Sequence, residues 1–168
     1  DAALLAPFVK GILERGMIPH IAAPAGISEF WEFFFPDIRI IKVDLSKAFT
    51  GEMKSFAEKH LSDYYEAVFG CSTVPVWAYL AAFSHSHRKA GMIEKGKLYK
   101  GARLSYNRIY NAAQNEHVQN RYSSLFKLFD YDFNPVKFNS EALEGESYLC
   151  IHPGAKWSPR RWPADYYM

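Results

Sequence analysis

Short strand-like runs alternate with helical patterns along most of this chain, and this alternation limits the fold more than any other feature. The helical segments carry apolar side chains every three or four residues, whereas the strand-like runs are short and rich in Ile, Val, Phe and Tyr. The predicted helices are 2–15, 27–35, 47–61, 74–83 and 116–129. The predicted strands are 17–23, 38–43, 64–71 and 87–92. Because such strands are joined by right-handed crossovers, the sequence predicts an α/β fold with a mostly parallel sheet.

The composition is that of an ordinary globular chain. Its 168 residues, 49% of them hydrophobic and 23% charged, can bury one good core. A net charge of only +2 argues against a nucleic-acid partner. No run approaches the roughly 18 to 20 apolar residues of a membrane span, and no signal-peptide pattern precedes the first helix. Cys71 and Cys150 each end a predicted strand, so we expect buried free thiols in a cytoplasmic protein.

The end of the chain, 148–163, predicts a strand, a loop and the start of a helix. An apolar run from Tyr148 to Ile151 is followed by Pro and Gly, then by cations, and then by Pro163, which suits the first helical position. Such a loop directs backbone N–H groups and the positive end of a helix dipole at one place, where an anion binds well. Basic Pro/Gly loops that bind nothing in particular are also common on α/β surfaces.

The complete string of this segment, His152-Pro153-Gly154-Ala155, a spacer and Arg160-Arg161-Trp162-Pro163, resembles the signature of glycosyltransferase family 9, the heptosyltransferases. The resemblance implies a GT-B-type enzyme with Rossmann-like domains, here truncated at both ends. Residues 1–138 would form the acceptor-side domain without its first strand, 139–146 a linker, and 147–168 the beginning of the donor-binding domain. The donor diphosphate would be held by Gly154, Ala155, Lys156, Arg160 and Arg161.

Asp1 stands at the N-cap position of the first predicted helix, where its ordinary role is to accept hydrogen bonds from free N–H groups. The run from Asp1 to Pro7 also resembles the family's Gly-Asp, apolar, Pro segment. The resemblance implies that Asp1 is the general base.

A strongly basic segment, from His85 to Arg103, follows the fourth predicted helix, and Glu94 is its single acidic residue. Its glycines, Gly91, Gly96 and Gly101, predict that part of it is a flexible loop. The segment is either a solvated face or a site for an anionic partner. The cations assigned to such a site are Arg88, Lys89, Lys97, Lys100 and Arg103. His85 and His87 lack further ligands at metal spacing, so no metal is predicted.

His117 and Arg121 are four residues apart and therefore project from the same flank of a helix. They could simply cover the rim of the core. They also resemble the family's pattern of His, three residues and Arg, which implies contacts with an anionic glycolipid acceptor.

The aromatic run from Phe30 to Phe35 is the most apolar patch of the chain. We expect it to pack in the core, because exposed aromatic clusters promote aggregation. The alternative is peripheral contact with a bilayer.

The resemblance implies inverting transfer of a sugar, heptose, from a nucleotide-diphosphate sugar donor to a lipopolysaccharide core acceptor. No further cofactor is implied. The reaction would occur in the bacterial cytoplasm, at the inner face of the inner membrane. Two alternatives are a non-catalytic protein that binds an anionic glycolipid and a GT-B-type sugar-nucleotide epimerase.

Overall fold

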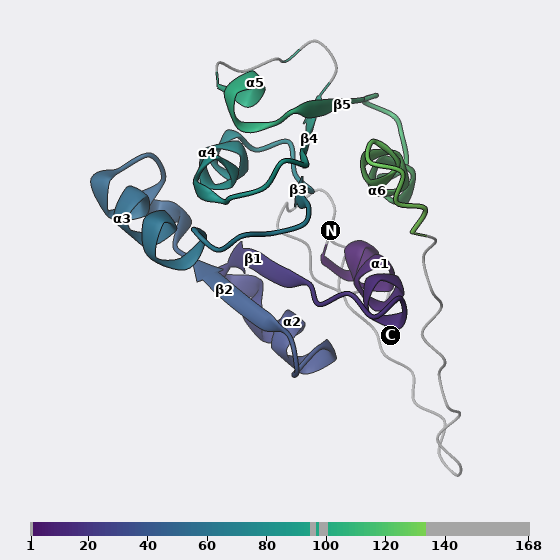
Figure 1. Ribbon diagram of the computed structural model, residues 1–168, viewed down its shortest axis with the longest axis horizontal. Coiled ribbons are helices and arrows are strands. Elements are labelled where there is room, and N and C mark those ends of the chain that lie inside the picture. Colours follow the sequence, from purple (N-terminus) through teal and green to yellow (C-terminus); the bar gives the residue numbers. More distant parts are fainter. Residues whose placement is uncertain (1, 95–96, 98–100, 134–168) are drawn as a thin grey trace, which may run out of the picture. The chain divides into compact units, whose positions relative to one another are not determined.

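The computed structural model describes residues 2–94, 97 and 101–133 (Figure 1). The chain divides into two compact units, Asp1–Lys137 and Phe138–Met168, and all described residues belong to the first. Asp1, Lys100, the predicted linker and the predicted diphosphate loop with Gly154, Ala155, Lys156, Arg160 and Arg161 lie outside the described residues.

The described strands form two sheets in which every pair is parallel. One sheet pairs β1 (His20–Pro24) with β2 (Arg39–Val43), and the other has the order β3 (Val68–Gly70), β4 (Lys89–Glu94), β5 (Arg108–Ala112). The helices are α1 (Ala2–Glu14), α2 (Ser28–Phe34), α3 (Gly51–His60), α4 (Pro75–Phe83), α5 (Ala102–Ser105) and α6 (Val118–Lys127). Short 3-10 helices, η1 (Ala25–Ile27) and η2 (Leu45–Lys47), follow β1 and β2. The predicted α/β fold with parallel strands is therefore confirmed.

Helix α1 is closed by a glycine cap. Gly16 has a φ of 74°, and its N–H donates to the Leu13 carbonyl at 2.8 Å. The Met17 N–H then donates to the Ile12 carbonyl at 3.3 Å. This left-handed residue closes the helix and turns the chain toward β1.

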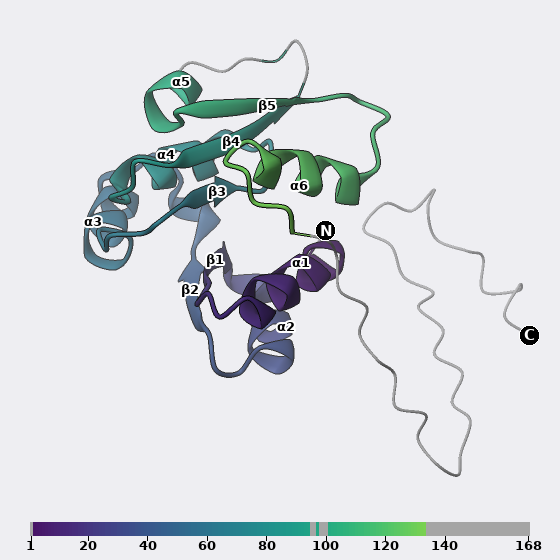
Figure 2. The same cartoon turned by 45° about the vertical axis from the view of Figure 1, so that its right-hand side comes forward.

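The sheet β3–β4–β5 separates two helical layers because successive side chains of a strand face opposite sides (Figure 2). Ala90 and Met92 of β4 pack in one cluster with α1 and α6. On the other face, Tyr106 packs with residues of α4, namely Ala78 and Ala81.

The smaller sheet is covered in the same way. Ile41 and Val43 of β2 pack with α3 and α4, whereas Ala23 of β1 packs with α1 and α2. Since α1 and α4 each contribute to clusters on both sheets, the two sheets share their helical layers.

Gly91 lies inside β4, as the predicted strand at 87–92 implies, and so is not part of the loop predicted from the glycines of the basic segment. The backbones of Gly70 and Gly91 instead lie against the ring of Tyr106, so closely that a Cβ atom at either position would overlap it. Glycine is needed here for close packing rather than for flexibility.

Candidate functional site

Ligands of parallel α/β sheets bind at the carboxyl ends of the strands. His20 begins β1, and its Nδ1 lies 3.4 Å from the hydroxyl oxygen of Tyr65. Arg39 begins β2 and pairs with Asp63 at 2.5 Å. Because Asp63 and Tyr65 precede β3, the amino ends of both sheets lie together. The strands end at the opposite side, which we call the carboxyl edge.

Glu116 organises the β5–α6 junction at this edge. The Tyr110 hydroxyl donates to its carboxylate, with distances of 2.6 and 2.7 Å to the two oxygens. The Ala113 N–H donates to the same carboxylate at 3.3 Å. Burial, together with the hydrogen bond to Glu116, raises the pKa of Tyr110. The tyrosine therefore remains a hydrogen-bond donor to Glu116 through the neutral pH range.

Arg121 of α6 forms hydrogen bonds across the same junction. Its Nε donates to the Glu116 carbonyl at 3.0 Å. Its Nη2 donates to the carbonyls of Ala113 and Gln114 at 2.8 and 2.9 Å. The planar fork of a guanidinium suits this arrangement of several acceptors. Two of the three nitrogens are thus engaged in holding the loop.

His117 is the N-cap residue of α6, and its Nδ1 accepts the Gln119 N–H at 3.4 Å. The proton of the neutral ring therefore belongs on Nε2. Since the side chain is exposed, Nε2 is available as a donor at the carboxyl edge. The structure thus brings His117 and Arg121 to one junction, as their spacing predicts, and gives both a role in local structure.

Lys97 lies beside this junction. Glu94, the last residue of β4, is paired in register with Ala112, the last residue of β5. Lys97 returns to Glu94 through a backbone hydrogen bond of 2.9 Å and an ion pair of 2.9 Å. Its side chain is 70% exposed, so a cation paired with the Glu94 carboxylate stands at the carboxyl edge.

Helix α1 begins at the same edge. Its Phe8 contacts Tyr122 of α6, with ring centroids 5.8 Å apart. Arg15, just after α1, donates to the carbonyl of Asp132, just after α6, at 2.5 Å. The two helices therefore run in the same direction (Figure 2), and Ala2 begins α1 at the carboxyl edge.

Arg88 and Lys89 lie at the other end of β4. Lys89 is the first residue of this strand of 6 residues, so it stands about 16 Å from Glu94. Its Nζ donates to the Ala81 and Ala82 carbonyls at the end of α4, at 3.0 and 3.4 Å, and burial lowers its pKa. Arg88 contacts the Glu66 carboxylate at 3.9 Å. The structure therefore does not bring these two cations to His117, Arg121 and Lys97.

Arg103 is exposed on the short helix α5, which precedes β5. Helix α5 lies next to α4 rather than α6 (Figure 1). The predicted group of acceptor cations is therefore divided among the carboxyl edge, the opposite edge and α5.

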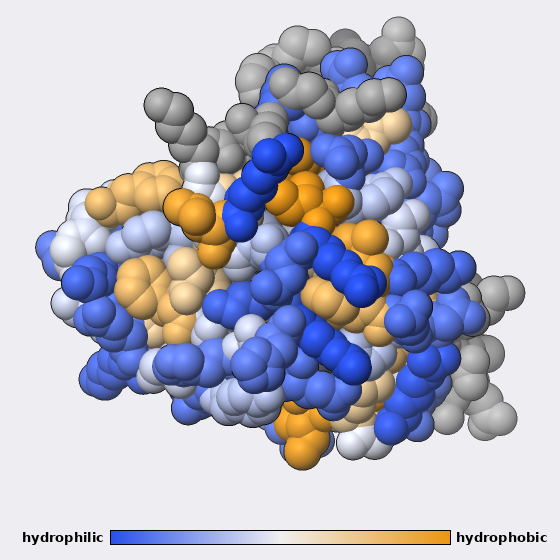
Figure 3. Space-filling view, turned by 45° about the horizontal axis from the view of Figure 1, so that its top comes forward, coloured by the Kyte–Doolittle hydropathy of each residue, from blue (hydrophilic) through white to orange (hydrophobic). Residues whose placement is uncertain are grey.

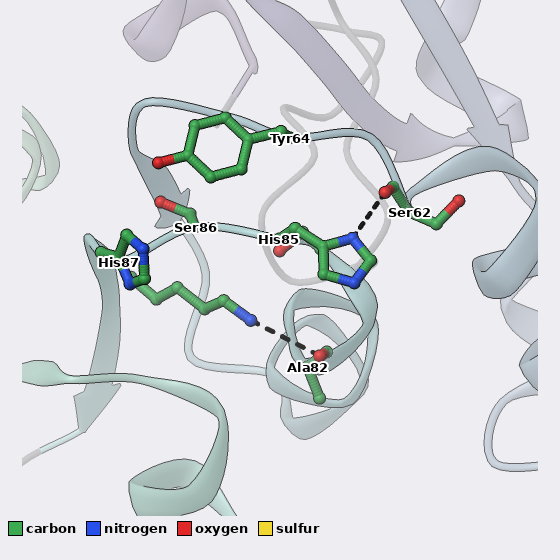
Figure 4. Close-up of a pocket in the computed structure, with 8 residues that line it drawn as sticks. Ser62, Tyr64, Ala82, His85, Ser86 and His87 are labelled. Atoms are coloured by element: carbon green, nitrogen blue, oxygen red, sulfur yellow. Dashed lines mark hydrogen bonds between the residues drawn. The ribbon is translucent and has the colours of Figure 1, made fainter.

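A surface pocket of about 480 Å³ lies at the amino ends of the strands (Figure 4). His85 lines it and donates from Nδ1 to the Ser62 carbonyl at 2.6 Å. Lys89 also lines it, and its Nζ donates to the Ala82 carbonyl of α4 at 3.4 Å. Within the described residues, no group of three or more His, Cys, Asp or Glu side chains is placed to hold a metal ion.

The aromatic run on α2 divides between core and surface. Trp31 and Phe35 are 2% and 6% exposed, as predicted for core residues, whereas Phe33 is 80% exposed. The face in Figure 3 shows apolar patches separated by hydrophilic side chains. No helix of the described part is long and apolar enough to cross a bilayer.

The role of Tyr110 is not predicted from the sequence, and Glu116 is predicted only as the first residue of a helix. Tyr110 lies in β5, a strand whose run Arg108–Ala112 is short and mixes polar with apolar residues. The available signal was the pair Ile109 and Tyr110, which is too brief to separate a strand from a loop.

No protein-family model matches the chain, and no curated protein matches it. Two solved structures do match, both of E. coli heptosyltransferase WaaC. The complex with ADP-2-deoxy-2-fluoro heptose has a TM-score of 0.61 at 20% identity, over 80% of this chain and 46% of that one. The complex with ADP has a TM-score of 0.59 at 20% identity, over 80% and 45%.

The described chain shares the fold of part of E. coli heptosyltransferase WaaC. It spans less than half of the solved heptosyltransferase chains that it matches. The predicted GT-B-type fold with parallel strands is confirmed.

Proposed function

We propose that the complete protein containing this chain is a glycosyltransferase that moves heptose from a nucleotide-diphosphate sugar to an anionic glycolipid of the lipopolysaccharide core. The observation that carries the proposal is the likeness to a solved heptosyltransferase that holds ADP-2-deoxy-2-fluoro heptose. The motif between His152 and Pro163 supports it from the sequence.

The proposed reaction is a direct displacement with inversion. A hydroxyl oxygen of the acceptor forms a bond to the anomeric carbon while the bond from that carbon to the diphosphate oxygen breaks. The hydroxyl proton passes to a base, and the departing diphosphate keeps the electron pair. We assign the base to Asp1, because a carboxylate can accept that proton.

The leaving diphosphate needs positive charge and N–H donors. We assign these to Lys156, Arg160 and Arg161 and to the backbone amides of Gly154 and Ala155. Charge from side chains and amides can stabilise the diphosphate, so the proposal includes no metal and no further cofactor.

The acceptor site is assigned to the carboxyl edge. Lys97, His117 and Arg121 offer cationic or N–H donor groups there, which suit a phosphorylated or carboxylated glycolipid. Lys100 remains a member of the proposed set. Arg88 and Lys89 are left out because they lie at the opposite edge, and Arg103 is left out because α5 precedes the amino end of β5. The proposed reaction places the protein at the cytoplasmic face of the inner membrane.

The test is a transfer assay with ADP-heptose and a lipopolysaccharide core acceptor. We expect Asp1→Asn to lower kcat by about 10² to 10⁴, the range for a general base, with donor binding unchanged. Asp37→Asn is the matched control, because Asp37 is exposed in the turn before β2, away from the carboxyl edge.

The other outcomes identify the alternatives. Full turnover by Asp1→Asn would remove the assigned base. Binding of the glycolipid without any transfer would indicate a non-catalytic binding protein, and a changed nucleotide sugar without an acceptor would indicate an epimerase.

A further inference from the structure

Phe49 adopts a backbone conformation that is unusual for its side chain. It has a φ of 63°, and among the described non-glycine residues only Asp130 shares a positive φ. The left-handed region is strained for a bulky aromatic residue. The side chain is nevertheless 60% exposed, so burial in the core does not account for the strain. Strained backbone of this kind concentrates at ligand sites.

Hydrogen bonds fix the chain on both sides of Phe49. Before it, the Asp44 carboxylate accepts the N–H of Ser46 at 3.0 Å and its hydroxyl at 2.7 Å. After it, the Thr50 hydroxyl donates to the Lys47 carbonyl at 2.6 Å and accepts the N–H of Met53 at 3.3 Å. The loop is therefore rigid and holds the Phe49 ring outward.

Phe49 lies between η2 and α3, in the segment that follows the carboxyl end of β2. Its neighbour is Tyr79 of α4, with ring centroids 5.5 Å apart and an interplanar angle of 64°. The two rings form a small aromatic surface. Phe49 follows the carboxyl end of its strand, β2, as the residues of the proposed acceptor site follow those of β4 and β5.

The surroundings of this aromatic surface are charged. Lys47 and Glu52 form an ion pair with side chains 49% and 70% exposed, and the Asp44 carboxylate lies in the same loop. An apolar ligand that covered these charged groups would have to remove their bound water, which costs free energy. A sugar ring avoids this cost, because it presents C–H groups to an aromatic face and hydroxyl groups to a polar rim.

We propose that Phe49, supported by Tyr79, is a stacking platform for a sugar ring of the acceptor saccharide. The proposal deepens the proposed function and rests on it for the identity of the saccharide. It adds an apolar contact to an acceptor site that is otherwise cationic.

The test uses Phe49→Asn and Phe49→Tyr in the complete protein. Asn tolerates the left-handed conformation, so it removes the ring without changing the backbone. Tyr keeps the ring. Phe33→Asn is the matched control, because Phe33 is 80% exposed near the end of α2, away from the carboxyl edge.

Transfer to a deacylated lipopolysaccharide core oligosaccharide is measured first. We expect Phe49→Asn to raise the KM for the oligosaccharide about tenfold, which corresponds to one lost ring contact, with the donor KM unchanged. Phe49→Tyr and Phe33→Asn should resemble the wild type. An unchanged oligosaccharide KM in Phe49→Asn overturns the platform.

Direct binding of the same oligosaccharide, followed by ligand-observed NMR, separates the two proposals. If the wild type binds it through Phe49 but transfers nothing, the platform stands and the proposed function fails. If the wild type does not bind it, the platform is overturned. Loss of binding to phosphatidylglycerol vesicles in Phe49→Asn, with oligosaccharide binding intact, would identify a bilayer contact and also overturn it.

Discussion

Gly91→Ala should destabilise the protein strongly, although it adds only one methyl group. The new Cβ would overlap ring carbons Cε2 and Cδ2 of Tyr106. Tyr106 is 3% exposed and packs against Ala78 and Ala81 of α4, so its ring has no free space into which it can move. The ring also covers Gly70 on the neighbouring strand.

The cost follows from the two ways in which the core can respond. Overpacking with the ring in place costs about 1 to 3 kcal/mol, and expelling the ring costs about as much as truncating it, about 3 to 5 kcal/mol. Alanine lowers the conformational entropy of the unfolded chain, which stabilises the folded protein by about 0.4 to 1 kcal/mol and offsets part of this cost. The overlap with the ring carbons is too close for the ring to stay in place, so the second response applies. We therefore expect a net loss of about 2 to 5 kcal/mol, which lowers Tm by roughly 6 to 25 °C for a domain of this size.

Thermal and urea denaturation, followed by circular dichroism, measure this loss. Gly51→Ala is the matched control, because a Cβ there meets nothing within 4 Å and lies at the start of α3. It should be neutral or stabilise by up to about 1 kcal/mol. In a Tyr106→Leu background, Gly91→Ala should cost much less. If it costs the same in both backgrounds, or nothing in the wild type, the packing argument is wrong.

Two further predictions concern the carboxyl edge. Arg121→Lys replaces the planar guanidinium, which donates to the Glu116, Ala113 and Gln114 carbonyls, with a point charge. We expect the free energy of unfolding to fall by about 1 to 3 kcal/mol and amide exchange in 113–117 to become faster. The control, Arg103→Lys on α5, should change neither. Unchanged amide exchange in Arg121→Lys would show that the hydrogen bonds of Arg121 do not hold this loop. Burial raises the pKa of the Cys71 thiol from 9.0 to about 12. In a Cys150→Ser background, we therefore expect Cys71 to react with a disulfide reagent at pH 8 at least about tenfold more slowly in the folded protein than in the unfolded protein. The stability that the uncharged Cys71 thiol contributes is complete below pH 9 and is lost as the pH rises toward 12. Rapid labelling of the folded protein at pH 8 would contradict the raised pKa.

Elements with a clear apolar period could be predicted from the sequence. The helix predicted at 2–15 is observed as Ala2–Glu14, and the strand predicted at 38–43 as Arg39–Val43. Both bury a continuous apolar face, which leaves its period in the sequence. Strand β5 could not be predicted, because Asn111 and Arg108 interrupt its short apolar run and its stability comes from pairing with β4.

The candidate site was harder to predict because charge along the sequence does not show which end of a strand a residue occupies. Lys89 and Lys97 are eight positions apart, but an intervening strand carries them to opposite edges of the sheet. Once Gly91 is placed inside β4, the basic segment is no longer one surface. The separation depends on the pairing of β4 with β3 and β5, which involves residues distant in the sequence.

The role of Arg121 shows how local structure and binding can depend on the same side chain. Its guanidinium holds the carbonyls of Ala113, Gln114 and Glu116, and Glu116 in turn receives the Tyr110 hydroxyl. These contacts fix the loop that leads into His117, the exposed cap of α6. A ligand on His117 would therefore meet a donor whose position is set before binding, which reduces the entropy lost when the complex forms. The spacing of His117 and Arg121 is thus explained by structure first, and any contact with an anionic acceptor uses a junction that is already assembled.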